Sequence, residues 1–311
     1  MEERYQKIID LLGEGKVKVG EPLASHTTFK IGGLADLFLV AETEEDLIKA
    51  VKVAREAGVV YLILGGGSNL LVGDKGFRGI VIKIRNSILR QSSGQEFKVQ
   101  SLNGKYLVTV EAGVPISVLL NELVKNSVAG LEFMAGIPGT IGGAIRGNGG
   151  AWQQNIGDKV LRVKVLFLDG KISWLTKDEC QFDYRTSRFK RGGGEIVLTA
   201  EFELSRGEPE EIKKKIQENL EKRSAQPKEP SAGSVFVNPK PQSAGEMIEQ
   251  CGLKGAQIGG AKISEKHANF IVNVGQAKAA DVVALMDLAR AKVKEKFGVD
   301  LKEEIVKVGE F

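Results

Sequence analysis

Apolar positions along the first part of the chain predict alternating strands and a helix. An apolar stripe at helical spacing follows Thr43, a residue type that often caps helix N-termini, and Gly58 ends it. The apolar run at residues 59–64 has the length of a buried strand. The pattern of residues 37–67 therefore predicts a strand, a helix and a second strand that ends in a glycine-rich loop.

A second block, residues 80–205, combines strands with one amphipathic helix. Pro115 precedes a predicted helix whose apolar residues share one face. Asp169-Gly170 is a hairpin turn signal between two strand-like runs. At residues 196–204 apolar and polar residues alternate, which predicts a strand with one buried face.

A charged segment near residues 205–230 separates this block from the rest of the chain. Apolar residues at four-residue spacing after Pro209 predict a surface helix, and Ser243 with Glu246 matches a capping box. The remaining predicted elements are a short helix ending at Gly252, a strand at 268–274, an amphipathic helix at 282–293 and a strand at 304–308.

The predicted fold class is α+β with mixed sheets, because helices and strands do not alternate as in regular βαβ units. A chain of 311 residues suggests about two domains. We expect one domain at residues 1–206, with subdomains at about 1–80 and 81–206, and a second at residues 207–311.

Composition is that of an ordinary globular protein, with 42% hydrophobic and 27% charged residues. The net charge of +4 is too small to imply nucleic acid as a partner but suits an anionic small substrate. Cys180 and Cys251 form no CxxC pair, and two histidines make a metal site improbable. No apolar run of ~20 residues predicts membrane insertion, and no signal core follows Met1, so we expect a cytoplasmic protein.

Two glycine-rich segments, residues 65–71 and 136–143, carry the candidate chemistry. Glycines permit positive φ and close approach of backbone N–H groups, which can form a nest for a pyrophosphate. Leu70 replaces the last glycine of a dinucleotide fingerprint, and neither segment has the Gly-Lys-Ser/Thr of a P-loop. The same glycines are also compatible with plain tight turns.

Six motifs in order resemble the UDP-N-acetylenolpyruvoylglucosamine reductase family. The two glycine segments resemble its GxGSNxL and GIPGxxGG loops. The other matching segments are residues 26–33 (HTTFKIGG), 184–189 (YRTSRF), 233–239 (GSVFVNP) and 260–270 (GAKISEKHANF). Together they run from residue 26 to the C-terminal part of the chain, so the resemblance covers nearly all of it.

The resemblance implies a fold, a cofactor and a reaction. The fold would be a two-part FAD-binding domain of the vanillyl-alcohol-oxidase type followed by a smaller α/β substrate domain, whose last strand returns to the active site. NADPH would reduce FAD, and the reduced flavin would reduce a UDP-sugar enolpyruvyl ether to UDP-N-acetylmuramate for peptidoglycan. Only 48 residues separate Arg185 from Ser234, which matches the shorter subclass without a tyrosine loop. We expect a monomer.

The resemblance also assigns site residues. Ser234 matches the family's catalytic serine and would donate the proton, Arg185 would bind a carboxylate, and Glu304 rather than Glu303 matches the catalytic glutamate. The expected FAD-binding residues are Gly65, Gly66, Gly67, Ser68, Asn69, Gly113, Pro138, Gly139, Thr140, Gly142 and Gly143. The expected substrate-binding residues are Tyr184, Asn238, Lys262, His267 and Asn269. We expect His26 to be structural or close to the cofactor.

One segment departs from the family pattern. After Gly143 the family commonly continues with an apolar pair and then N-A-G-A, whereas residues 144–151 read AIRGNGGA. Arg146 and the added glycines would alter flavin contacts, or Arg146 would neutralise a phosphate. Val237 and Val306 also stand where polar residues are common.

Two other readings remain open from the residues alone. The chain could be an oxidase on the same FAD fold, and in that case NADPH would not bleach its flavin under anaerobic conditions. It could also be a non-catalytic nucleotide-binding protein. No second dinucleotide fingerprint exists for NADPH, so we expect it to share one cleft with the UDP-sugar in turn. The central expectation is that amides of both glycine loops bind one pyrophosphate and direct the flavin ring towards Ser234 and Glu304.

Overall fold

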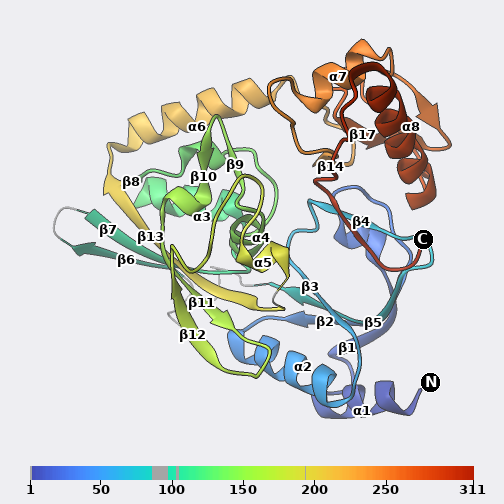
Figure 1. The fold of residues 1–311 in the computed structure, drawn as a ribbon. Coiled ribbons are helices and arrows are strands. Elements are labelled where there is room, and N and C mark those ends of the chain that lie inside the picture. Colours follow the sequence, from blue (N-terminus) through green and yellow to red (C-terminus); the bar gives the residue numbers. More distant parts are fainter. Residues whose placement is uncertain (1, 86–96, 103–104, 193) are drawn as a thin grey trace. The chain divides into compact units, whose positions relative to one another are not determined.

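The protein divides into two compact units whose segments interleave along the chain (Figure 1). The structure, a computed structural model, describes residues 2–85, 97–102, 105–192 and 194–311. Unit 1 comprises Met1–Lys16, Leu39–Gly66 and Ile82–Arg223, and unit 2 comprises Val17–Phe38, Gly67–Val81 and Ser224–Phe311. The boundary expected at residues 206/207 separates an FAD-binding from a substrate-binding domain, whereas these two units are defined by compactness alone. The expected boundary therefore stays a prediction.

A four-stranded sheet near the start of the chain has the order β1-β2-β5-β3. Its strands are β1 (Val17–Pro22), β2 (Leu34–Ala41), β5 (Phe77–Ile84) and β3 (Tyr61–Leu64). The chain passes from one unit to the other within β2 and β5. A three-ten helix, η1 (Leu23–His26), follows β1.

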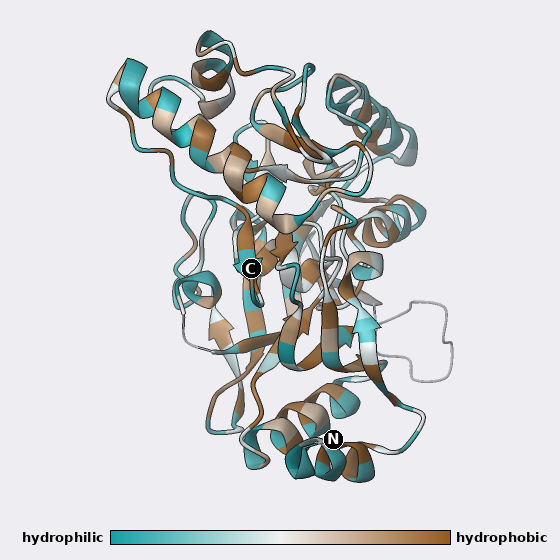
Figure 2. Ribbon diagram, turned by 90° about the vertical axis from the view of Figure 1, so that its right-hand side faces the viewer, coloured by the Kyte–Doolittle hydropathy of each residue, from teal (hydrophilic) through white to brown (hydrophobic). Residues whose placement is uncertain are grey.

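Helix α2 (Glu44–Glu56) begins where the sequence predicts. The Thr43 Oγ1 atom accepts a hydrogen bond from the Asp46 N–H at 3.0 Å, and acidic residues occupy the first turn. A second helix, α1 (Glu3–Leu12), packs beside α2. Hydrophobic and hydrophilic residues alternate along the helices near the N-terminus, as expected of amphipathic helices (Figure 2).

An antiparallel sheet of six strands forms the centre of unit 1, with the order β12-β11-β13-β7-β6 and β8 paired to β13. Asp169-Gly170 lies in the turn between β11 and β12, which confirms the predicted hairpin. The strands are β6 (Phe97–Leu102), β7 (Lys105–Glu111), β8 (Val128–Ala129), β11 (Val160–Leu166), β12 (Ile172–Thr176) and β13 (Ile196–Arg206). The short pair β9 (Gly150–Ala151) and β10 (Gln154–Asn155) forms a separate hairpin.

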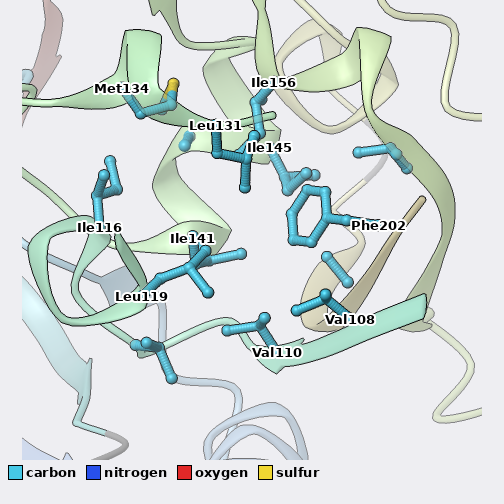
Figure 3. Packing of buried hydrophobic residues seen from close by; sticks show 14 of the residues in the cluster. Val108, Val110, Ile116, Leu119, Leu131, Met134, Ile141, Ile145, Ile156 and Phe202 are labelled. Atoms are coloured by element: carbon cyan, nitrogen blue, oxygen red, sulfur yellow. The ribbon is translucent and has the colours of Figure 1, made fainter. Parts of the chain in front are cut away.

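Helices cover one face of this sheet and build the core of unit 1. Val108 and Phe202 of the sheet pack with Leu119, Ile141 and Ile145 of the helices (Figure 3). The helices are α3 (Ile116–Lys125), α4 (Ile141–Gly147), α5 (Arg188–Arg191), α6 (Pro209–Arg223), and the three-ten turns η2 (Glu132–Met134) and η3 (Ile156–Asp158). The helices predicted after Pro115 and Pro209 are thereby confirmed.

Strand β13 corrects one prediction, because both of its faces are buried over residues 196–202. Glu201 is 6% exposed although it belongs to the face predicted to be polar. The Arg162 guanidinium binds the Glu201 carboxylate through two hydrogen bonds and lies 4.4 Å from the Trp174 ring centroid. Neighbouring strands therefore cover the second face with an ion pair, which the alternation within one strand cannot reveal.

Residues 144–157 explain the unusual glycine-rich run. Asn148 caps α4 in the left-handed conformation, with φ of 45°. Its side chain accepts from the Gly157 N–H at 3.0 Å and donates to the Asp183 carbonyl at 2.9 Å. The run is thus an ordered turn of unit 1, and the Arg146 side chain at the end of α4 is exposed.

Unit 2 has its own sheet and core, with the strand order β14-β17-β16-β15. Ser243 and Glu246 form the predicted capping box at the start of α7. The elements are β14 (Ser231–Ser234), β15 (Gln257–Ile258), β16 (Ala261–Ile263), β17 (Phe270–Asn273), α7 (Ala244–Gln250) and α8 (Ala279–Phe297). The last strand, β18 (Val306–Val308), pairs in parallel with β4 (Leu70–Val72).

Gly149→Ala should raise the free energy of unfolding by about 0.4–1 kcal/mol, because alanine restricts the unfolded chain. Its Cβ would lie 3.5 Å from the nearest atom, in Ala144, which is ordinary packing. The matched control is Gly150→Ala, whose Cβ would lie 2.0 Å from the Gln154 carbonyl oxygen and should lower stability by about 1–3 kcal/mol. Urea unfolding measures both, and equal effects of the two variants would contradict this account of the turn.

Candidate functional site

Two glycine loops of unit 1 lie against each other between the end of β3 and the start of α4. A Cβ atom on Gly65 would lie 2.5 Å from Thr140 Oγ1, and one on Gly66 would lie 2.7 Å from the Gly139 Cα. Real Cβ atoms essentially never come within 3.0 Å of other heavy atoms. Only glycine at residues 65 and 66 therefore permits this approach of the two backbones.

A cavity of about 510 Å³ opens beside these loops within unit 1. This volume is in the range of small-molecule and cofactor sites. Helices α3 and α6 contribute apolar side chains to its wall. The lining residues are Gly66, Pro115, Ser117, Leu120, Asn121, Ala135, Gly136, Ile137, Pro138, Gly139, Thr140, Ile216 and Leu220.

Several amides of the second loop are engaged within the protein. Ile137, Ile141 and Gly142 donate their N–H groups to backbone carbonyls. Gly143 donates to Oγ1 of Thr140, the N-cap residue of α4, at 3.4 Å. The glycines at 142 and 143 therefore shape the loop through these internal hydrogen bonds.

The backbone N–H groups of the two loops that have no protein acceptor suit an anion. Within the described part of the chain, the N–H groups of Gly66, Gly139 and Thr140 donate to no protein acceptor. These three amides lie on two backbones in close approach, beside a cavity, and no Cβ covers the two glycines. Such a set of donors fits a phosphate or a diphosphate, so the residues present fit the diphosphate of FAD.

The second half of the first loop lies in unit 2 and serves a structural purpose. Gly67 has φ of 63°, and a Cβ on it would lie 2.2 Å from the His26 carbonyl oxygen. The Asn69 Nδ2 donates to the Glu304 carbonyl at 3.2 Å, and the Asn69 carbonyl accepts from the Val306 N–H at 2.9 Å. Ser68 is half-buried in this turn, and Gly113 is buried in the turn before α3.

Ser234 and Glu304 lie on neighbouring segments of unit 2. Ser234 ends β14 directly after Gly233, which has φ of 77°. The next residue, Val235, accepts from the Glu304 N–H at 2.9 Å and donates to the Asn269 carbonyl at 2.8 Å. The backbone therefore brings the two predicted catalytic residues together, and both are half-buried.

Asn269, expected to bind the substrate, is completely buried. Its Oδ1 accepts from the Phe236 N–H at 3.0 Å, and its Nδ2 donates to the Phe236 carbonyl at 2.8 Å. The side-chain amide is thus used in fixing the backbone after Ser234. Contact between this side chain and a substrate stays a prediction.

Glu303, the competitor of Glu304, is engaged elsewhere in unit 2. Its carboxylate pairs with Arg290 at 2.7 Å and with Lys307 at 2.9 Å. Burial opposes ionisation, but the hydrogen bonds from Lys307 and Arg290 lower the pKa of the Glu303 carboxyl below its usual value. The expected strand at residues 304–308 begins only at Val306, so strand alternation does not distinguish the two glutamates.

The other substrate candidates of unit 2 lie near α7 and β16. The Asn238 Oδ1 accepts from the first N–H of α7 at 3.1 Å. Lys262 forms an ion pair with Glu265. Burial lowers the pKa of His267, so its ring is neutral near pH 7, and its Nδ1 accepts a backbone hydrogen bond at 3.2 Å.

Arg185 and Tyr184 form the tip of a tight turn in unit 1. Arg185 has φ of 55°, and its Nη1 donates to the Gly150 carbonyl at 3.1 Å. Tyr184 is 51% exposed. Arg223, at the end of α6, lies close to this turn. Burial and, to a smaller extent, the charge of Arg185 lower the pKa of the Arg223 guanidinium. A Cβ atom added to Gly136 would lie 2.7 Å from the Arg223 Cδ. Arg223 is a residue that the sequence did not single out, because it ends an ordinary charged helix.

The HTTF motif anchors the strand that carries Ser234. The Thr28 Oγ1 donates to the Ser231 carbonyl at 2.7 Å, three residues before Ser234. His26 is structural, since its Nε2 lies 2.8 Å from Glu21 Oε1 and its ring stacks on Phe38 at 4.3 Å. The motif could be found in the sequence, but this partner lies 203 residues away along the chain.

Other site classes receive no support from the described residues. Both cysteines are free thiols, and burial raises the pKa of Cys180 to about 12, so this thiol is unreactive. Across the described ranges, no cluster of His, Cys, Asp or Glu could hold a metal ion. None of the described helices is long and apolar enough to span a bilayer.

Two family models match the chain in the expected order. A model described as FAD binding domain matches residues 35–176, which include both glycine loops. A model described as UDP-N-acetylenolpyruvoylglucosamine reductase, C-terminal domain, matches residues 226–308, which include Ser234 and Glu304. These matches confirm the expected fold class, an FAD-binding part followed by a C-terminal α/β part.

Full-length relatives and a solved structure agree with these matches. The chain is 43% identical over 310 residues to UDP-N-acetylenolpyruvoylglucosamine reductase of Halalkalibacterium halodurans, covering 99% of each. It is 42% identical to reductase 1 of Bacillus anthracis, covering 99% of this chain and 100% of that protein. The crystal structure of the enzyme from Thermus caldophilus superposes with a TM-score of 0.76 at 35% identity, covering 94% and 98% of the two chains.

Gly66→Ala should weaken FAD binding roughly 5- to 150-fold, because the added Cβ would separate the two loops at a cost of ~1–3 kcal/mol. The measurement is the flavin content and FAD affinity of the purified protein. Gly149→Ala, a glycine in unit 1 with room for a Cβ, is the control and should keep its flavin. Wild-type affinity in Gly66→Ala would show that the contact at residues 66 and 139 does not form the FAD site.

Proposed function

The chain belongs to the UDP-N-acetylenolpyruvoylglucosamine reductase family, and from this premise we propose which of its residues perform the family's reaction. The protein is an FAD-dependent oxidoreductase that uses NADPH to reduce UDP-N-acetylglucosamine enolpyruvate to UDP-N-acetylmuramate in peptidoglycan synthesis. The observation that carries the residue assignment is the backbone hydrogen bond that joins the Ser234 and Glu304 segments through Val235.

Bound FAD supplies the hydride-transfer chemistry that amino-acid side chains lack. The amides of Gly66, Gly139 and Thr140 would bind its diphosphate, because they are free donors beside the 510 Å³ cavity in the described structure. Thr140 has a second role, since its side chain accepts a hydrogen bond from the Gly143 N–H and so caps the N-terminus of α4.

Ser234 donates the proton that completes reduction of the double bond. Hydride adds to one alkene carbon, and the serine Oγ–H protonates its neighbour, so that the product gains one hydrogen at each carbon. A serine is a weak acid and needs a partner that returns its proton. Glu304 suits this relay, because its N–H is bonded to the carbonyl of Val235, the residue after Ser234.

Arg185 binds the carboxylate of the enolpyruvyl group and stabilises the negative charge that develops during reduction. Its planar guanidinium suits a carboxylate, and a hydrogen bond to the Gly150 carbonyl fixes its orientation. Exposed Tyr184 precedes it in the same turn. Lys262, Asn238 and His267 remain proposed contacts of the UDP-sugar, with His267 acting as a neutral donor or acceptor.

We also propose that the protein works as a monomer in the cytoplasm. Nucleotide-sugar and NADPH chemistry and the two free thiols fit a reducing compartment. Sedimentation of the holoenzyme measures the oligomeric state, and a stable dimer would contradict this part of the proposal.

Ser234→Ala should leave flavin reduction by NADPH nearly unchanged and slow reoxidation by the enolpyruvyl substrate by about 10²–10⁴-fold, the usual contribution of a general acid. Anaerobic stopped-flow absorbance of the flavin follows the two half-reactions separately. Ser231→Ala, on the same strand, is the control, because the Ser231 backbone rather than its side chain anchors β14. Equal slowing of both half-reactions would assign Ser234 to folding or cofactor binding instead.

NADPH and the UDP-sugar should give parallel double-reciprocal plots, because both nucleotides would use one cleft in turn and NADP⁺ would leave before the UDP-sugar enters. Initial rates over a grid of both concentrations test this expectation. Intersecting lines would require a ternary complex and a separate place for each nucleotide.

A further inference from the structure

Trp152 occupies a place in unit 1 that packing does not account for. Trp152 and Gln153 form the two-residue turn between β9 and β10, with φ of 54° and 61°. Left-handed conformations at both positions define a turn that favours Asn-Gly, and they are unfavourable for a bulky side chain. Burial does not compensate, because Trp152 is 44% exposed. Strained residues of this kind gather at binding sites.

Trp152 lines a second cavity of unit 1, about 270 Å³ in volume. Helix α6 contributes Lys222, whose Nζ lies 5.4 Å from the Trp152 ring centroid, and Lys215 and Glu218 also line the cavity. Gln154 of β10 completes the polar lining. The lining therefore combines the aromatic residues Trp152 and Phe133 with cationic donors and anionic acceptors.

This combination suits a nucleobase. Bases stack on aromatic side chains, and their edges present both N–H donors and carbonyl acceptors. The Glu132 carboxylate already accepts from the Gly130 N–H at 3.1 Å, so exposed Glu218 is the acceptor suited to a base N–H. The ammonium groups of Lys215 and Lys222 suit base carbonyls or a nearby phosphate.

The Trp152 hairpin is connected to the proposed carboxylate-binding residue. Strand β9 begins at Gly150, whose carbonyl accepts from the Arg185 guanidinium at 3.1 Å. The residue that Arg185 contacts, Gly150, therefore precedes Trp152 by only two residues along the chain. Both substrates of the proposed function are nucleotides, so either could bring a base to this hairpin.

We propose that Trp152 is a nucleobase-stacking residue and that the cavity between the β9–β10 turn and α6 is the base subsite of a nucleotide substrate. This proposal rests on the proposed function for the identity of the nucleotide, either the UDP-sugar or NADPH. The chemistry recognised is a planar base on a phosphorylated ribose.

Tryptophan fluorescence tests the proposal on the holoenzyme. The chain has two tryptophans, so Trp174→Phe leaves Trp152 as the one emitter. Titration with UDP, UDP-N-acetylglucosamine and NADP⁺ should give saturable quenching by the nucleotide that occupies the subsite. Quenching by the uridine compounds assigns the subsite to the UDP-sugar, quenching by NADP⁺ alone assigns it to the reductant, and either result supports the proposal.

Kinetics provide the second test. Trp152→Ala should raise KM for the quenching nucleotide roughly tenfold or more, whereas Trp152→Phe should keep KM close to wild type because it retains an aromatic face. Lys222→Gln should also raise that KM. Lys214→Gln, an exposed position of α6 outside the cavity lining, is the matched control and should not.

The proposal is overturned if no nucleotide changes the Trp152 emission and Trp152→Ala leaves both KM values at wild type. Turnover of the wild-type enzyme in the same assay reports on the proposed function separately. Absence of wild-type turnover would contradict the reductase assignment, whereas normal turnover with silent Trp152 would contradict the stacking role alone.

Discussion

The close approach of two backbones at Gly66 and Gly139 is the constraint on which the proposed FAD site of unit 1 depends. A side chain at residue 65 or 66 would collide with the second loop, and without that approach three donors on separate loops could not converge. The internal hydrogen bonds of the second loop are equally important. They engage the amides at 141 and 142 and leave those of Gly139 and Thr140 for a ligand. Loop shape and ligand affinity therefore have the same origin.

In unit 2 the buried side-chain amide of Asn269 fixes the backbone next to the proposed catalytic serine. The Asn269 side chain satisfies both backbone groups of Phe236, and its carbonyl accepts from Val235. Loss of such buried partners typically destabilises a protein by ~1–3 kcal/mol per unsatisfied group. Val235 in turn accepts from the Glu304 N–H, so a single residue after Ser234 links the backbone of both proposed catalytic residues to Asn269.

Elements with local signals could be predicted from the sequence, and features that depend on distant partners could not. Thr43 caps its helix and Asp169-Gly170 turns its hairpin, because the relevant hydrogen bonds lie within three or four residues. Glu201 was expected on a solvated face, and its partner Arg162 lies on another strand. The motif that contains Asn269 identifies a segment and not the direction of a side chain, so its hydrogen bonds to Phe236 could not be predicted. Family resemblance thus proposed the site residues, and the structure gave the hydrogen-bond partners of each side chain.

The most direct test of this account measures the amide protons of the glycine loops when FAD binds. In an amide-resolved NMR spectrum of the protein with and without FAD, the Gly66, Gly139 and Thr140 resonances should shift strongly downfield, as expected for amides that acquire a phosphate acceptor. Those of Ile141 and Gly142 should change little, because they already donate to backbone carbonyls. Unchanged resonances at Gly66 and Gly139 in the FAD-bound protein would contradict the central claim that the two loops together bind the diphosphate.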